Sequence, residues 1–158
     1  MTSVQDSLSV NDLDDWARRP STSLRRDRFG LERAGVEILA PSPVVDYVAW
    51  YTEDFFARGD SPARARLVIH DANPERIASV KDVRLTPPLR RAMLPTAPDT
   101  VCVVDDTHST VHLFLAAATR DEPKLVAVRI LRALVLRALL EDGFPFFHAA
   151  CFTLHGVG

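Results

Sequence analysis

The order of strand-like and helix-like segments predicts a mixed α/β fold, a small mixed sheet with two main covering helices, incomplete at its C-terminus. Short β-branched runs recur along the 158 residues, and they alternate with two long segments of helical apolar spacing. The composition, with 47% hydrophobic and 25% charged residues, is that of a globular protein with an ordinary core.

Residues 1–34 are polar and are expected to form an N-terminal arm that is partly disordered. Within it, residues 10–17 suit one short helix with Asn11 as its cap. Trp16 is either the residue that anchors this arm or an exposed, flexible side chain. Residues 35–158 are assigned to the N-terminal portion of one α/β domain.

The first half of this domain predicts two strands and two helices. The alternating segment 35–40 is bounded by Gly and Pro and predicts a strand. Ser42-Pro43 is typical of a helix start, and the aromatic-rich helix that follows is expected to end near Gly59. Residues 64–71 predict the next strand. Asn73-Pro74 then predicts the cap of a short helical turn that runs to Val80.

The second half predicts a hairpin and the longest helix. Residues 83–85 suggest a short strand, and several prolines after it predict an irregular connection. Residues 100–104 and 110–116 predict a hairpin. A helix is expected over 124–141, ended by Gly143 just past its last turn.

Charge and cysteine content argue against several classes of protein. The net charge is −2, from 19 basic and 21 acidic residues, so neither nucleic acid nor a membrane surface is an expected partner. Cys102 and Cys151 lie far apart in apolar runs, which favours free thiols in a reducing cytoplasm. The N-terminus lacks the apolar core of a signal peptide. Three arginines in the longest apolar run oppose membrane insertion.

The last residues carry the most specific pattern. A buried strand is expected from Phe146 to Leu154, with a glycine turn after it. His148 opens this strand eight residues before Gly156, and Gly156 and Gly158 make a Gly-x-Gly hairpin. This arrangement resembles the segment just before the phosphate-binding loop in the HPr kinase/phosphorylase-like family of P-loop proteins. It is similar to divergent bacterial members, several of which act in peptide modification, and the resemblance extends more loosely back to Gly35.

The resemblance implies an ATP-dependent phosphotransferase that uses Mg2+ and acts on a hydroxyl of a protein, peptide or small molecule. It implies a catalytic role for His148, whose alternative is a structural histidine bonded to a backbone carbonyl. No GxxxxGK[ST] sequence is present. The chain is therefore interpreted as a catalytically incomplete N-terminal portion of a kinase. Neither ATP nor Mg2+ is expected to bind it tightly.

A second group of polar residues surrounds the predicted hairpin. Two histidines four positions apart share a metal only on a helix, so His108 and His112 predict no metal site. Asp105 and Asp106 are interpreted as turn residues. The alternative function is a non-catalytic binding or assembly module that pairs with a partner protein or peptide. Homo-oligomerisation through the terminal strand is also left open.

Overall fold

The computed structural model describes residues 7–18, 23–59, 61–92, 94, 97, 99–116 and 121–144, and it has the mixed α/β fold that the sequence predicts. The predicted strand 146–154 lies outside the described residues, and so do His148, Cys151, Gly156 and Gly158. The described elements are β1 (Ser7–Leu8), α1 (Val10–Arg18), β2 (Leu24–Leu31), β3 (Ala34–Pro41), α2 (Ser42–Thr52), β4 (Ala57–Arg58), β5 (Ala63–Asp71), α3 (Pro74–Asp82), β6 (Arg84–Leu85), β7 (Leu89–Ala92), β8 (Thr100–Asp105), β9 (Thr110–Leu115) and α4 (Asp121–Glu141).

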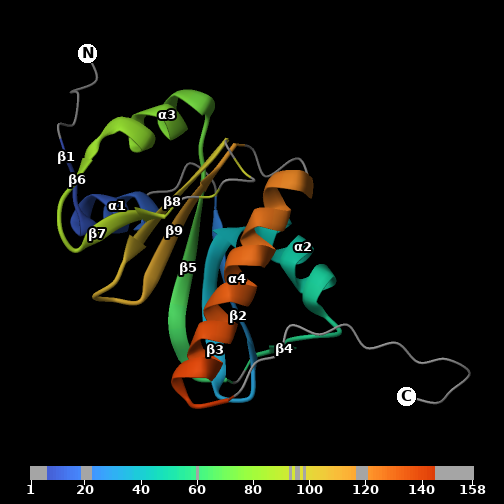
Figure 1. Ribbon diagram of the computed structural model, residues 1–158. Coiled ribbons are helices and arrows are strands. Elements are labelled where there is room, and N and C mark those ends of the chain that lie inside the picture. Colours follow the sequence, from blue (N-terminus) through green and yellow to red (C-terminus); the bar gives the residue numbers. More distant parts are fainter. Residues whose placement is uncertain are drawn as a thin grey trace, which may run out of the picture.

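The main sheet has seven strands in the order β4-β2-β3-β5-β9-β8-β7 (Figure 1). Its centre is parallel, because β5 pairs in parallel with β3 on one side and with β9 on the other. Both flanks are antiparallel: β2 pairs with β3, and β8 pairs with β9 and β7. The sheet is therefore mixed.

Helices α2 and α4 cover one face of this sheet (Figure 1). The core between them and the strands includes Val36 and Ile38 of β3, Leu67 and Ile69 of β5, and Leu131 of α4. All five side chains are fully buried. These are the two covering helices that the sequence predicts.

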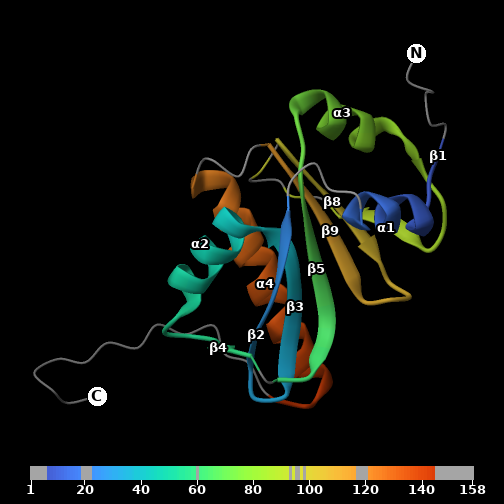
Figure 2. The ribbon, with the colours of Figure 1, turned by 180° about the vertical axis from the view of Figure 1, so that it is seen from behind.

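Helices α1 and α3 pack at one end of the opposite face (Figure 2). A second apolar cluster there joins Leu13 of α1 and Ile77 of α3 to Val103 and Phe114 of the hairpin strands. Trp16 contacts Phe114 edge to face at 6.0 Å, and the Arg76 guanidinium lies 3.7 Å from the centre of the Trp16 ring. Trp16 thus anchors this helix.

The N-terminal region contains more regular structure than its sequence suggests. Helix α1 begins one residue before Asn11, and its cap is made by Ser9 and Asp12: the Ser9 backbone N–H donates to the Asp12 carboxylate at 2.8 Å. The prediction of Asn11 as the cap is wrong. Strand β2, which the sequence places in the arm, pairs with β3 along all of its eight residues.

Two further strands lie in segments that gave weak signals. Strand β7 occupies part of the proline-rich connection and pairs with β8 at the sheet edge. The predicted strand at 83–85 is β6, which pairs in parallel with β1 outside the main sheet. The prediction of an unbroken irregular connection is therefore wrong.

The helix boundaries follow ordinary capping chemistry. The Asn73 side chain accepts a hydrogen bond from the Arg76 backbone N–H, as expected at the start of α3. Helix α4 starts three residues earlier than predicted and ends as predicted, with Gly143 at φ +82°. Helix α2 ends at Thr52, before the expected Gly59, and a turn follows it.

Helix α4 offers a matched test of the core. Leu131→Ala removes a fully buried side chain and is expected to lower the free energy of unfolding by about 2–5 kcal/mol. Leu140→Ala, on the same helix, removes a side chain that is 55% exposed and should change that free energy by about 0.5 kcal/mol or less. Urea denaturation of both variants measures the difference. Equal losses would contradict this packing of α4.

Candidate functional site

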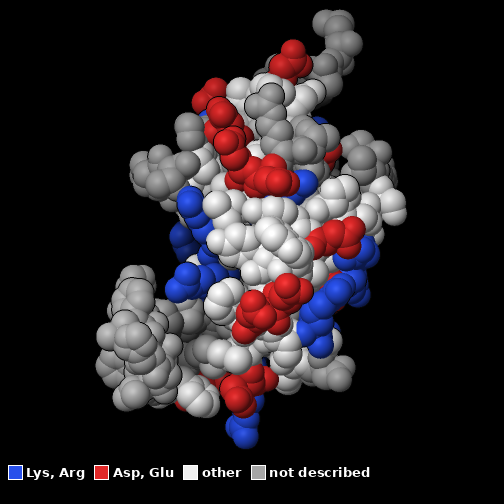
Figure 3. All heavy atoms as spheres, turned by 90° about the vertical axis from the view of Figure 1, so that its right-hand side faces the viewer, with Lys and Arg blue, Asp and Glu red and all other residues white. Residues whose placement is uncertain are grey.

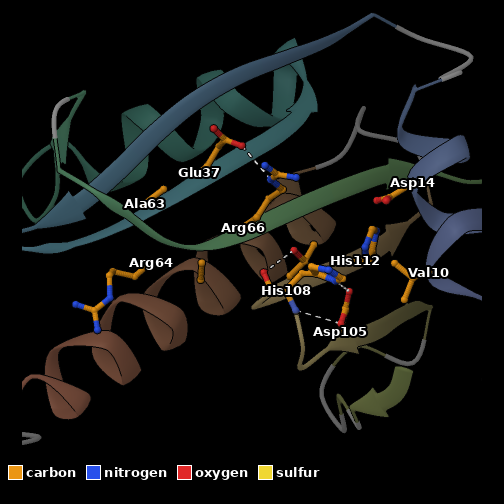
Figure 4. A pocket seen from close by; sticks show the side chains of 11 residues that line it. Val10, Asp14, Glu37, Ala63, Arg64, Arg66, Asp105, His108 and His112 are labelled. Carbon is orange, nitrogen blue, oxygen red and sulfur yellow. Dashed lines mark hydrogen bonds and ion pairs between the residues drawn. The ribbon is translucent and has the colours of Figure 1, made fainter. Parts of the chain in front are cut away.

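A polar pocket of about 370 Å³ opens on the sheet face that α2 and α4 do not cover (Figure 4). Helix α1 and strands β3, β5, β8 and β9 contribute its walls, together with the turn between β8 and β9. Its lining residues are Val10, Asp14, Glu37, Ala63, Arg64, Ala65, Arg66, Asp105, His108, Thr110 and His112. Three acids, two arginines and two histidines in one hollow make it the strongest candidate site.

The β8–β9 turn holds an imidazole against a buried carboxylate. Asp105 is 1% exposed, and its carboxylate accepts backbone N–H bonds from Thr107 at 3.0 Å and from His108 at 3.3 Å. Its second oxygen lies 2.6 Å from Nδ1 of His108. The His108 side chain itself is 64% exposed. When Nδ1–H donates a hydrogen bond to this carboxylate, Nε2 of the ring is unprotonated and can take a proton from a ligand.

A pair of imidazoles, those of His70 and His112, lies beside the pocket, and His112 lines it. Nε2 of His70 on β5 is 3.0 Å from Nδ1 of His112 on β9, and the His70 ring also stacks on Phe114 with centroids 4.4 Å apart. One ring donates to the other, so Nε2 of His112 is a donor when His70 donates and an acceptor when His112 donates. His112 is 2% exposed and makes no other hydrogen bond within the described residues. Its Nε2 is the atom available to a ligand.

Burial keeps both of these histidines neutral. Desolvation lowers the pKa of His70 to about 3, and the adjacent His112 adds to this shift. Desolvation also lowers the pKa of His112 to about 4, although the carboxylates of Asp14 and Asp105 oppose the shift. At neutral pH this pair is therefore an uncharged hydrogen-bonding group.

Most of the formal charges in the pocket are already paired. Nε of Arg66 donates to Glu37 at 2.9 Å, and Arg64 makes two contacts with Asp142 at the end of α4, at 3.0 and 3.1 Å. Figure 4 shows Glu37 and Arg66 joined across β3 and β5. Among the described residues, the one ion pair that Asp14 makes is a 3.9 Å contact with Arg18. The Asp14 carboxylate and the imidazoles of His108 and His112 are thus the groups best placed to meet a polar ligand.

Part of the group of polar residues that the sequence places around the hairpin lies in the pocket. His108 and His112 both line the pocket. Asp105, which was expected in the turn, is the last residue of β8, and its carboxylate accepts a backbone N–H bond from the turn. Within the described ranges, no three His, Cys, Asp or Glu residues are arranged to hold a metal ion. Asp106 lies outside the pocket lining and pairs with Arg90 at 2.6 Å.

The hydrogen-bond partners of His108 and His112 were not predicted from the sequence. His70 falls within the strand predicted at 64–71, and nothing in that pattern indicates its contact with His112, 42 positions away. The available signal was one histidine in each of two predicted strands, at 64–71 and 110–116. The pairing of Asp105 with His108 follows the local pattern Asp-x-x-His in a turn, which could have been proposed from the sequence.

The buried histidine pair predicts a stability that depends on pH. Both pKa values are lower in the folded state than in the unfolded chain, so the unfolded state binds more protons as the pH falls below about 6.5. Stability is full above that pH and is lost as the pH falls toward the folded-state values. Between about pH 7.5 and about pH 5, we expect a loss of about 2 kcal/mol for each histidine.

Urea denaturation at the two pH values checks this dependence. In the double variant His70→Gln, His112→Gln the loss should be much smaller, because an amide does not titrate in this range. Leu140→Ala, an exposed change that alters no titratable group, provides the control and should leave the dependence unchanged. A double variant as sensitive to pH as the parent protein would contradict the assignment.

No protein-family model, no curated protein and no solved structure matches this chain. Among the described residues, no helix combines the length and the apolar character needed to cross a membrane. The functional assignment accordingly depends on the chemistry of the pocket and on the sequence pattern of the last residues.

Proposed function

We propose that this chain is the N-terminal portion of an HPr kinase-like phosphotransferase and that its pocket receives the hydroxyl-bearing group of a protein, peptide or small-molecule substrate. The main support is the Asp105–His108 pair, which presents an imidazole to a polar hollow. The spacing of His148, Gly156 and Gly158 supplies the family resemblance. The cytoplasm is the compartment proposed with it.

In this proposal His108 acts as the general base. The substrate hydroxyl donates to Nε2 of His108, which takes the proton as the oxygen becomes a nucleophile. Asp105 holds the ring in the tautomer that this step needs, and it stabilises the imidazolium that forms. Nε2 of His112 and the carboxylate of Asp14 are available to orient the remaining polar groups of the substrate.

The phosphate donor is not placed by the described residues. ATP and Mg2+ are implied by the family resemblance, but the chain contains no GxxxxGK[ST] sequence and the described residues include no ligand set for a metal ion. No step is therefore assigned to the nucleotide. Sequencing the gene past the codon for Gly158 tests the kinship. A glycine-rich loop ending in Lys-Ser or Lys-Thr would support it, and a stop codon would favour the binding module.

His108→Gln tests the role of the pocket in the product of the whole gene. We expect turnover in an ATP-dependent phosphate-incorporation assay to fall by about a hundredfold or more, because glutamine cannot accept the proton. The melting temperature should change little, since the His108 side chain is 64% exposed. Thr107→Ala, in the same turn, is the matched control and should keep normal turnover. Equal turnover in the two variants would refute the assignment of the base.

His148→Ala tests the family resemblance separately. In the same assay it is expected to lower turnover more than it lowers thermal stability, because the resemblance implies a catalytic role for this residue. Steady-state kinetics and a melting curve of one preparation give both quantities. Normal kinetics with a large fall in melting temperature would identify His148 as a structural residue.

A further inference from the structure

The outer side of α2 and the turn after it carry three exposed aromatic rings, those of Trp50, Tyr51 and Phe55, beside the partly buried Tyr47. Tyr47, Trp50 and Tyr51 follow the i, i+3, i+4 spacing of one helix face, while Val44 and Val48 of the same helix are buried. Phe55 follows in the turn after the helix. We call Tyr47, Trp50, Tyr51 and Phe55 the aromatic face of α2.

This face is exposed to an extent that its residue types rarely tolerate. Trp50 is 64% exposed, Phe55 66% and Tyr51 44%. The rings contact one another, with Tyr47 centred 5.7 Å from Trp50 and 6.0 Å from Tyr51. Clustered large aromatic side chains on a surface are typical of protein interaction sites.

The charges around the aromatic face are of both signs: Nζ of Lys124 lies 5.6 Å from the centre of the Tyr47 ring, and two exposed acids, Glu53 and Asp54, immediately precede Phe55. Residues 42–57 include Asp46, Glu53 and Asp54 but no Lys or Arg. Asp46 pairs with Arg25 at 2.8 Å, whereas Glu53 and Asp54 make no ion pair within the described part of the chain. Figure 3, which views the side of the molecule where α2 lies, shows uncharged surface with acidic groups above and below it and basic groups to its left and right.

We propose that the aromatic face of α2 binds a segment of a partner protein that combines Lys or Arg with apolar residues. Cationic side chains would meet Glu53 and Asp54 and would stack on Trp50 and Tyr51, while the apolar residues would cover Phe55. The two exposed acids, Glu53 and Asp54, which we call the acidic rim, disfavour an anionic lipid surface. A second copy of this chain would instead protect the face in proportion to protein concentration, without any peptide.

The two tryptophans of the chain allow a direct measurement. In a Trp16→Phe background, Trp50 is the sole tryptophan, and its fluorescence reports on this face. The probe is a synthetic peptide of alternating Arg and Leu, compared with a peptide in which Glu replaces Arg. The cationic peptide should shift the emission to the blue and protect Trp50 from acrylamide, and the acidic peptide should do neither. Calorimetry on the unsubstituted chain repeats the comparison without the Trp16 change.

Variants of the rim and of the face supply the controls. Tyr51→Ala should weaken binding of the cationic peptide by about tenfold or more. Glu53→Gln with Asp54→Asn should weaken it several-fold and reduce its dependence on salt. Glu75→Gln, an exposed acid on α3, is the matched control and should leave the affinity unchanged.

Four results would overturn the proposal. The first is equal binding, or no binding, of the two peptides at millimolar concentration. The second is protection of Trp50 in the isolated monomer, which would assign the face to residues 145–158 of the same chain. The third is protection that grows with protein concentration without peptide, which would assign it to a second copy. The fourth is binding that Tyr51→Ala leaves unchanged. None of these results bears on the pocket, so the proposed function is tested independently.

Discussion

The parallel pairing of β5 with β3 and with β9 is the constraint on which the rest of the molecule depends. Because side chains alternate along a strand, β5 turns Leu67 and Ile69 toward the core under α2 and α4, and it turns Arg66 and His70 toward the opposite face. The same strand therefore supplies the centre of the apolar core and one wall of the pocket. A slip of one residue against either neighbour would exchange these two roles and would bury an arginine among leucines.

Much of the fold was predictable because burial leaves a periodic trace in the sequence. The strands near 35–40 and 64–71, the hairpin and the helix that ends before Gly143 are all found where apolar periodicity and capping residues indicate them. Strand β2 was not predicted, because four of its eight residues are charged and only part of it is buried. It forms because all eight of its residues pair with β3. The residue pattern of β2 itself does not indicate this pairing.

The candidate site likewise combines a contact between residues close in sequence with a contact between residues far apart in sequence. Asp105 and His108 lie three positions apart, so their contact belongs to the turn itself and its residues are visible in the sequence. The contact between His70 and His112 requires the register in which Val68 pairs with His112 and His70 with Phe114. The sequence pattern identifies both strands but does not determine their register. The pocket exists only where the two kinds of contact meet, on one face of the sheet.

The small parallel pair of β1 and β6 has a consequence for the order in which the chain folds. The Leu8 carbonyl accepts hydrogen bonds from both the backbone N–H and the hydroxyl of Thr86, 78 positions further along. Closing so long a loop costs more entropy than closing the short turn between β8 and β9, and few residues reward it. The hairpin should therefore form among the early steps, and residues 7–18 should dock among the last. Hydrogen exchange would then find α1 the first helix to open, which exposes the inner wall of the pocket while the sheet remains intact.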